Sequence, residues 1–225
     1  MRTWREPVLA VALITLAVAL LAGLLVDGLW SSPYAGAAAT VIMWVGLGGV
    51  IVYAFRQSRP AGLLRFRALD VLYGVMLGLI LRIVQGWIET GERGAPAFPS
   101  VALVDGRVGI EWWVVDVAGA LVVAPVLEEL FFRGVLLVAV YSALRRPFGA
   151  MTAGITAVLA SSGLFVIVHA LARGGDLSGT LSLFLLGLVC GSLVVLTGRV
   201  WSAVILHVIF NASYLALIAV GTLGA

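Results

Sequence analysis

The chain has 225 residues, of which 62% are hydrophobic and 11% are charged, whereas about 25% are charged in an ordinary soluble domain. This composition excludes a soluble globular protein, and the apolar residues fall in blocks of about 20, the length that crosses a hydrocarbon core of about 30 Å. The net charge of +3 comes with fourteen arginines and no lysine, and it does not indicate a nucleic-acid partner.

Seven apolar segments are predicted to form helices, and none shows the alternation of a transmembrane β-strand. They cover residues 7–30, 34–55, 70–88, 112–142, 149–172, 178–197 and 200–222. The predicted fold is therefore all-α, a polytopic transmembrane bundle of seven helices, or of eight if the fourth segment divides near Pro125. In the second case Glu128 falls in the first turn of a new helix, where the helix dipole favours an anion.

The arginines are distributed unequally between the two predicted sides of the membrane. One side holds Arg2, Arg5, Arg56, Arg59, Arg65, Arg67, Arg145, Arg146 and Arg199, and the other holds Arg93, Arg107 and Arg173. Because short basic loops usually stay in the cytoplasm, the N-terminus is predicted to be cytoplasmic, with the chain in the inner (plasma) membrane of a cell. Residues 89–111 are predicted to form the one long external loop, and the chain 1–225 a single transmembrane domain whose first hundred residues supply the N-terminal spans and this loop.

Small residues recur one helical turn apart in two of the predicted helices. The pairs Gly74/Gly78 and Gly187/Gly191 have the spacing that allows close helix contacts in membranes. Cys190, the one cysteine, lies within an apolar run, which predicts a small packing residue and no cysteine metal cluster.

Seven ionisable side chains are predicted to lie at membrane depth, where each charge costs about 2.5–3.5 kcal/mol to insert. They are Arg82, Asp116, Glu128, Glu129, Arg133, His169 and His207. Glu129 and Arg133 are four residues apart and can pair on one helix face, whereas Glu128 points about 100° away. Arg82 is expected to pair with Asp116 or with a carboxylate of the external loop.

Each of the two histidines of the chain lies four residues from another side chain of interest: His169 follows Phe165, and Asn211 follows His207. Residues four apart share one face of a helix, so each pair is expected to point in the same direction. A buried glutamate and a histidine that converge on one water can act as general base and proton relay, while a second histidine and an amide hold a developing oxyanion. The predicted hydrolytic site is therefore Glu128, His169, His207 and Asn211. Alternatively, Glu128, His169 and His207 can hold a divalent metal such as zinc, because His₂Glu is a catalytic zinc set.

The depths of the two histidines set a geometric condition on this site. Counted at 1.5 Å per residue from the Arg-rich turns, His169 lies about 30 Å deep and His207 about 10 Å deep. They meet only if the turn at 197–200 is recessed or the helices tilt strongly. Imidazole rings more than about 12 Å apart would leave a single site without support.

The three motifs EExxxR at 128–133, FxxxH at 165–169 and HxxxN at 207–211 resemble those of the CAAX prenyl endopeptidase and bacteriocin-processing (CPBP) family of intramembrane proteases. The resemblance extends through Ala124-Pro125 and the turn at 196–199, and it implies a catalytic core over residues 112–215.

The resemblance also implies a role for each motif residue. Glu128 and His169 would activate the water, and His207 and Asn211 would stabilise the tetrahedral intermediate. The residues implied to support the site are Glu129, Arg133 and Phe165.

The leading hypothesis is an endopeptidase that cleaves a membrane-associated peptide or protein, lipidated or not, with membrane lipid as its other partner. A second hypothesis is a non-catalytic immunity or sensor-partner protein of the same fold, whose effect would survive loss of both Glu128 and His169. A third, an ion or proton transporter, is disfavoured because no inverted repeat is apparent and the polar residues cluster in one place. The sequence predicts neither the substrate nor the oligomeric state.

Overall fold

The computed structural model describes residues 4, 6–93, 98–101 and 112–223. Its helices are, in chain order, α1 (Glu6–Leu29), α2 (Ala35–Gln57), α3 (Ala68–Arg93), η1 (Trp112–Val123), α4 (Ala124–Glu129), η2 (Leu130–Leu137), α5 (Val138–Arg173), α6 (Leu177–Thr197) and α7 (Trp201–Leu223). The segments η1 and η2 have π-helical hydrogen bonding. No strand occurs among these residues, so the predicted all-α fold is confirmed for the described part of the chain.

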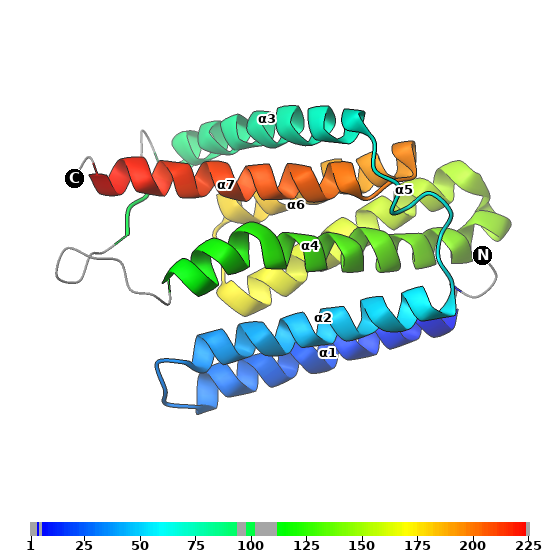
Figure 1. Cartoon of the computed structure of the whole chain (residues 1–225), viewed down its shortest axis with the longest axis horizontal. Coiled ribbons are helices and arrows are strands. Elements are labelled where there is room, and N and C mark those ends of the chain that lie inside the picture. The colour runs from blue at the N-terminus through cyan, green and yellow to red at the C-terminus, as the bar shows by residue number, and fades with distance from the viewer. Residues whose placement is uncertain (1–3, 5, 94–97, 102–111, 224–225) are drawn as a thin grey trace.

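The predicted count of seven or eight helices is not confirmed, because six stretches of the described chain are long and apolar enough to cross a membrane. The difference lies in residues 117–172, which form one helical stretch of 56 residues, about 84 Å if straight. At Gly149 the backbone takes φ +81° and ψ 168°, a combination almost restricted to glycine. The chain reverses there, and Figure 1 shows the second arm of α5 returning past α4. The reversal allows the stretch to fit a core of about 30 Å.

The helix does not divide near Pro125. Val123 (φ −65°, ψ −52°) and Leu130 (φ −64°, ψ −36°) are both helical, so η1, α4 and η2 follow one another without a break. Pro125 has no N–H to donate, and the wider turns of η1 that precede it accommodate that missing hydrogen bond. Glu128 therefore lies inside a continuous helix, without the open N–H groups of a helix start.

The external loop begins later in the chain than predicted. Helix α3 continues to Arg93, five residues beyond the predicted end at 88, and most of the remaining loop lies outside the described residues. Of the part that is described, Val101 donates a backbone hydrogen bond of 3.0 Å to Thr222 Oγ1 near the end of α7.

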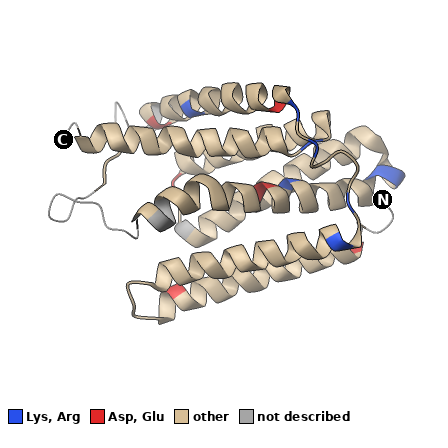
Figure 2. Ribbon diagram, viewed as in Figure 1, with Lys and Arg blue, Asp and Glu red and all other residues tan. Residues whose placement is uncertain are grey.

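Several turns that carry arginine meet at one end of the bundle, as Figure 2 shows. Arg199 forms an ion pair of 2.9 Å with buried Asp70 at the start of α3, and this hydrogen-bonded carboxylate raises the pKa of Arg199. Val200 is fully buried and donates to the Leu63 carbonyl at 3.0 Å. The segment around Leu63 therefore contacts Val200, at the end of the turn at 197–200. Which side of the membrane this end faces stays a prediction.

Both predicted glycine pairs lie at close helix contacts. A Cβ added to Gly74 would stand 2.6 Å from Ile205 Cβ, and one added to Gly78 would stand 2.9 Å from the Leu206 carbonyl oxygen. Ile205 and Leu206 both belong to α7. A Cβ on Gly187 would stand 3.0 Å from Ser162 Cβ. These glycines therefore let α3 approach α7 and α6 approach α5 at backbone distance.

The centre of the bundle is the helix that runs through α4 and η2. In Figure 1 it lies between the α1–α2 pair on one side and α7 with α3 on the other, with α6 and α5 behind. Residues 131–137 and Glu129 are buried, so Glu129 lies in the packed core, whereas the neighbouring Glu128 is half-buried.

Candidate active site

Glu128 lies between the two histidines. One carboxylate oxygen, Oε1, is 3.8 Å from Nε2 of His169 on α5, and the other, Oε2, is 3.8 Å from Nε2 of His207 on α7. The Glu128 side chain is 14% exposed, so it remains accessible to water or substrate. The structure therefore brings three of the four predicted catalytic side chains together from three different helices.

The hydrogen bonds of the two imidazoles determine which ring nitrogen faces Glu128. Nδ1 of His169 lies 2.9 Å from the Phe165 carbonyl oxygen, and Nδ1 of His207 lies 3.0 Å from Oε1 of Glu129. Both partners are acceptors, so each Nδ1 carries the proton, and in the neutral ring each Nε2 keeps a lone pair. The two lone pairs point at the Glu128 carboxylate across 3.8 Å, a gap too long for a direct hydrogen bond. Such a gap suits a group that bridges them, such as a water or a cation.

The predicted ion pair between Glu129 and Arg133 is present, with Nη1 3.0 Å from Oε1 and both side chains fully buried. The same Oε1 faces His207, so Glu129 stands between the guanidinium and the imidazole. The Arg133 Cζ lies 4.7 Å from the centroid of the Phe165 ring, which adds a cation–π contact to the charge balance. Glu129 and Arg133 thus hold the tautomer and the orientation of His207.

Phe165 packs against the guanidinium of Arg133 and against both histidines. Its ring centroid is 4.3 Å from that of His169 and 5.8 Å from that of His207. The two imidazoles are therefore at most about 10 Å apart, inside the 12 Å limit set from the sequence. The predicted condition that the imidazoles meet is fulfilled, whereas the recessed turn or strong tilt expected to cause it stays a prediction.

Asn211 makes a hydrogen bond to the helix that carries Glu128. Its Nδ2 donates to the Ala120 carbonyl of η1 at 2.8 Å, which ties α7 to the helix that carries Glu128. One of its two amide N–H groups is thereby used for this structural contact. Its role as an oxyanion donor stays a prediction.

Arg82 binds α7, and its expected pairing with Asp116 or a carboxylate of the external loop stays a prediction. Its Nε donates to Ser213 Oγ at 3.1 Å and its Nη2 to the Phe210 carbonyl at 2.6 Å, both on α7, and its guanidinium stacks 4.0 Å over the Phe210 ring. The side chain of Asp116 lies outside the described residues. Arg82 thus donates to a hydroxyl and a backbone carbonyl oxygen of α7. The sequence did not indicate these partners, because only charged side chains were expected to pair with Arg82.

A cavity of about 410 Å³ opens beside Glu128 and His169, within the size range of ligand sites. One wall is formed by α4 and the end of α5, and the other by α1 and α2, where Asp27, Thr40 and Trp44 line it. The sequence reasoning missed these lining residues and assigned α1 and α2 only as compatible spans. The one available signal was Asp27, an acid at the end of an otherwise apolar segment.

The donor atoms fit a divalent metal in kind. In the described part of the chain no three His, Cys, Asp or Glu side chains are already gathered as a metal site. However, the two Nε2 atoms and the Glu128 carboxylate form a His₂Glu set, and both Nδ1 atoms are held by oxygen acceptors, as those of zinc-bound histidines are. Zinc bonds of 2.0–2.1 Å bring tetrahedral ligands to about 3.3 Å from each other. The 3.8 Å separations would therefore have to shorten by about half an ångström.

In the part of the chain that the structure describes, the fold and the site are those of an all-helical, multi-pass membrane protein with two histidines on either side of one carboxylate. Residues 110–213 match the family model described as Type II CAAX prenyl endopeptidase Rce1-like. This match confirms the resemblance stated from the three motifs. No curated protein and no solved structure matches the chain.

Proposed function

We propose that the chain is an intramembrane endopeptidase that hydrolyses a peptide bond in a membrane-associated peptide or protein. The observation that carries this proposal is the position of Glu128, with one carboxylate oxygen 3.8 Å from each histidine Nε2. The cavity of about 410 Å³ that begins at Glu128 and His169 supports it, since it provides room for a peptide segment. The family match over residues 110–213 supports the same reaction class.

The proposed reaction begins with a water held between Glu128 and the Nε2 atom of His169. Glu128 takes a proton from this water while the water oxygen bonds to the carbonyl carbon of the substrate. The carbonyl π electrons move to the carbonyl oxygen, which becomes the oxyanion. The intermediate then collapses, the C–N bond breaks, and the proton held by Glu128 passes to the leaving amine. A zinc ion held by Glu128, His169 and His207 would supply a Lewis acid for the same water.

His207 is proposed to stabilise the developing oxyanion. Because its Nδ1 proton is directed at Glu129, Nε2 can donate a hydrogen bond only when the ring is doubly protonated. The Glu129 carboxylate at 3.0 Å offsets the charge of that imidazolium. Asn211 is proposed to contribute its second amide N–H, with the first fixed on Ala120.

The test is cleavage by the purified chain in proteoliposomes, with membrane-anchored peptides carrying either a lipidated or an unmodified cysteine near the C-terminus. Fragments are identified by mass spectrometry. Glu128→Gln preserves the size of the side chain and should lower the rate by about 10²–10⁴-fold, the usual contribution of a general base. The matched control is Glu6→Gln, at an exposed acid at the start of α1, which should cleave at the wild-type rate.

Undiminished cleavage by the Glu128→Gln variant would refute the assignment of Glu128. Metal analysis of the same preparation distinguishes the two forms of the mechanism: cleavage by metal-free protein supports a glutamate-activated water alone. Activity that is lost on chelation and restored by zinc supports the metal form.

A further inference from the structure

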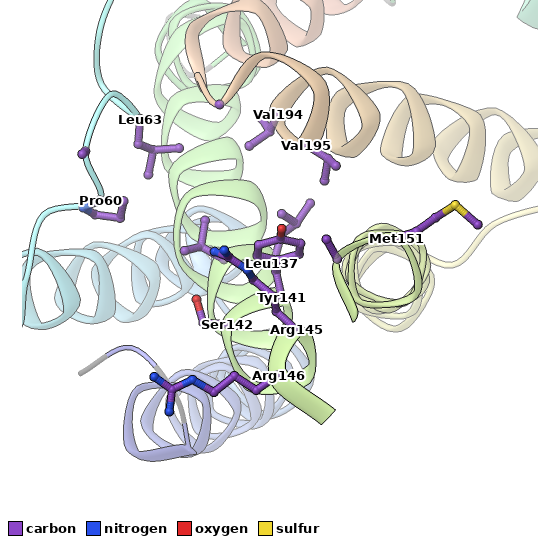
Figure 3. A pocket seen from close by; sticks show the side chains of 14 residues that line it. Pro60, Leu63, Leu137, Tyr141, Ser142, Arg145, Arg146, Met151, Val194 and Val195 are labelled. Carbon is purple, nitrogen blue, oxygen red and sulfur yellow. The ribbon is translucent and has the colours of Figure 1, made fainter. Parts of the chain in front are cut away.

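A second cavity, of about 700 Å³, lies at the arginine-rich end of the bundle and shares no lining residue with the cavity at Glu128. We call it the end pocket. Figure 3 shows it between the segment at Pro60 and Leu63, the helix that passes from η2 into α5, the second arm of α5 at Met151 and the end of α6 at Val194 and Val195.

The walls of the end pocket are mostly aliphatic, and its polar groups lie on one helix. Tyr141, Ser142, Arg145 and Arg146 are the polar side chains that line it. Tyr141 precedes Arg145 by four residues, and Ser142 precedes Arg146 by four, so each hydroxyl shares a helix face with a guanidinium. Both arginines are exposed and both hydroxyl residues are half-buried. Among the described residues that line the pocket there is no Asp or Glu, so the polar part favours an anion.

The apolar part of the end pocket opens onto surface that faces outward. Met151 is 79% exposed and Val195 is 40% exposed, and Phe148 at the neighbouring turn is 61% exposed. In a chain whose long helices have the length and hydropathy of membrane spans, such side chains beside arginines mark the level where hydrocarbon meets the headgroups. A ligand here therefore meets cations and hydroxyls at one end and acyl tails at the other.

We propose that the end pocket is a binding site for an anionic phospholipid. The phosphate would lie on Arg145 with a hydrogen bond from the Tyr141 hydroxyl on the same helix face, and both groups are donors suited to phosphate oxygens. Arg146 and Ser142, on the adjoining face, would add positive charge and a second donor for the headgroup. One acyl chain would cover the aliphatic wall between Leu137 and Val195. A soluble acidic peptide would satisfy the arginines but would leave that wall exposed, whereas a lipid satisfies both.

The location of the end pocket also predicts what the lipid does. Leu137 ends η2, the segment that begins directly after Glu129, and Val194 and Val195 belong to α6. A lipid that contacts both elements would stabilise their packing against each other. This inference is independent of proteolysis, because it concerns binding and stability alone.

The test is native mass spectrometry of the full chain in a neutral detergent, with dioleoyl phosphatidylglycerol and dioleoyl phosphatidylcholine as probes. Phosphatidylglycerol should bind more tightly, and the preference should weaken as salt rises. The double variant Arg145→Gln/Arg146→Gln should weaken phosphatidylglycerol binding by about 25-fold, about fivefold for each arginine. The matched control Arg56→Gln removes an exposed arginine of the same end that does not line the pocket, and it should bind as the wild type does.

A second pair of variants tests the apolar wall. Val195→Phe fills the pocket and should lower lipid binding, whereas Leu196→Phe, at a residue that is 83% exposed and outside the pocket, should not. Circular dichroism of both variants serves to check that they remain folded. Equal affinity for the two lipids would overturn the proposal, as would full binding by the double arginine variant. Displacement of the lipid by inorganic phosphate or by a soluble acidic peptide at equal concentration would overturn it too.

Discussion

Replacing Arg133 with methionine should destabilise the protein strongly, because it leaves the Glu129 carboxylate buried without its cation. Both side chains are fully buried and Nη1 lies 3.0 Å from Oε1. At an effective dielectric constant of 20, two unit charges at that distance attract each other by about 5.5 kcal/mol. Removal of one partner of a buried pair typically costs about 3–5 kcal/mol, so we expect a loss of that size for Arg133→Met.

The double variant Glu129→Leu/Arg133→Met should be more stable than the single variant, since it removes both charges and keeps the volume apolar. It should still fall short of the wild type by about 1–3 kcal/mol, because Nδ1 of His207 loses its acceptor in the core. The free energy of unfolding can be measured by titration with dodecyl sulfate in mixed micelles, followed by circular dichroism.

Arg56→Met provides the control, because Arg56 is exposed at the end of α2 and its replacement should change the free energy of unfolding by less than about 0.5 kcal/mol. A cost below about 1 kcal/mol for Arg133→Met would refute the reasoning. A double variant no more stable than the single variant would refute it equally, since the cost would then not arise from an uncompensated carboxylate.

Two further changes test the packing of the helices. Gly78→Ala should lower the unfolding free energy by about 1–3 kcal/mol, because its Cβ would stand 2.9 Å from the Leu206 carbonyl oxygen. The control Gly86→Ala, where nothing lies within 4 Å of the added Cβ, should raise the unfolding free energy by up to about 1 kcal/mol. If the two variants respond alike in thermal unfolding, the close contact at Gly78 is contradicted. Gly149→Ala should lower the unfolding free energy by about 1–3 kcal/mol through backbone strain alone, since φ is +81° and the added Cβ has no atom within 4 Å. An unchanged melting temperature would show that the reversal does not depend on that backbone conformation.

Local spacing was sufficient to predict the parts of the site that lie on one helix. The pair Glu129–Arg133 follows from a separation of four residues, and the same spacing placed Phe165 beside His169. The contact between Glu129 and His207 spans 78 residues of chain, so no local pattern specifies it. It depends on how α7 packs against α4, and the close contacts of the α3 glycines with α7 help to determine this packing.

Hydropathy could not distinguish residues that face lipid from residues that line the cavity, because both are apolar. This is why α1 and α2 were assigned as spans without a role, although Trp44 and Met43 form a wall of the cavity at Glu128. The reversal in α5, in contrast, lies where the sequence predicts the end of one helix at 142 and the start of the next at 149. The break considered near Pro125 does not occur, because the chain continues through Pro125 in helical conformation.

The central claim, that Glu128 and His169 act on one water, is tested most directly by a double-mutant cycle on cleavage. The rates of Glu128→Gln, His169→Gln and the double variant are compared in one proteoliposome assay. Groups that act as a unit are strongly non-additive, so the account predicts that the double variant is no slower than the slower single variant. Losses that multiply would show that the two side chains act independently and would contradict the single site.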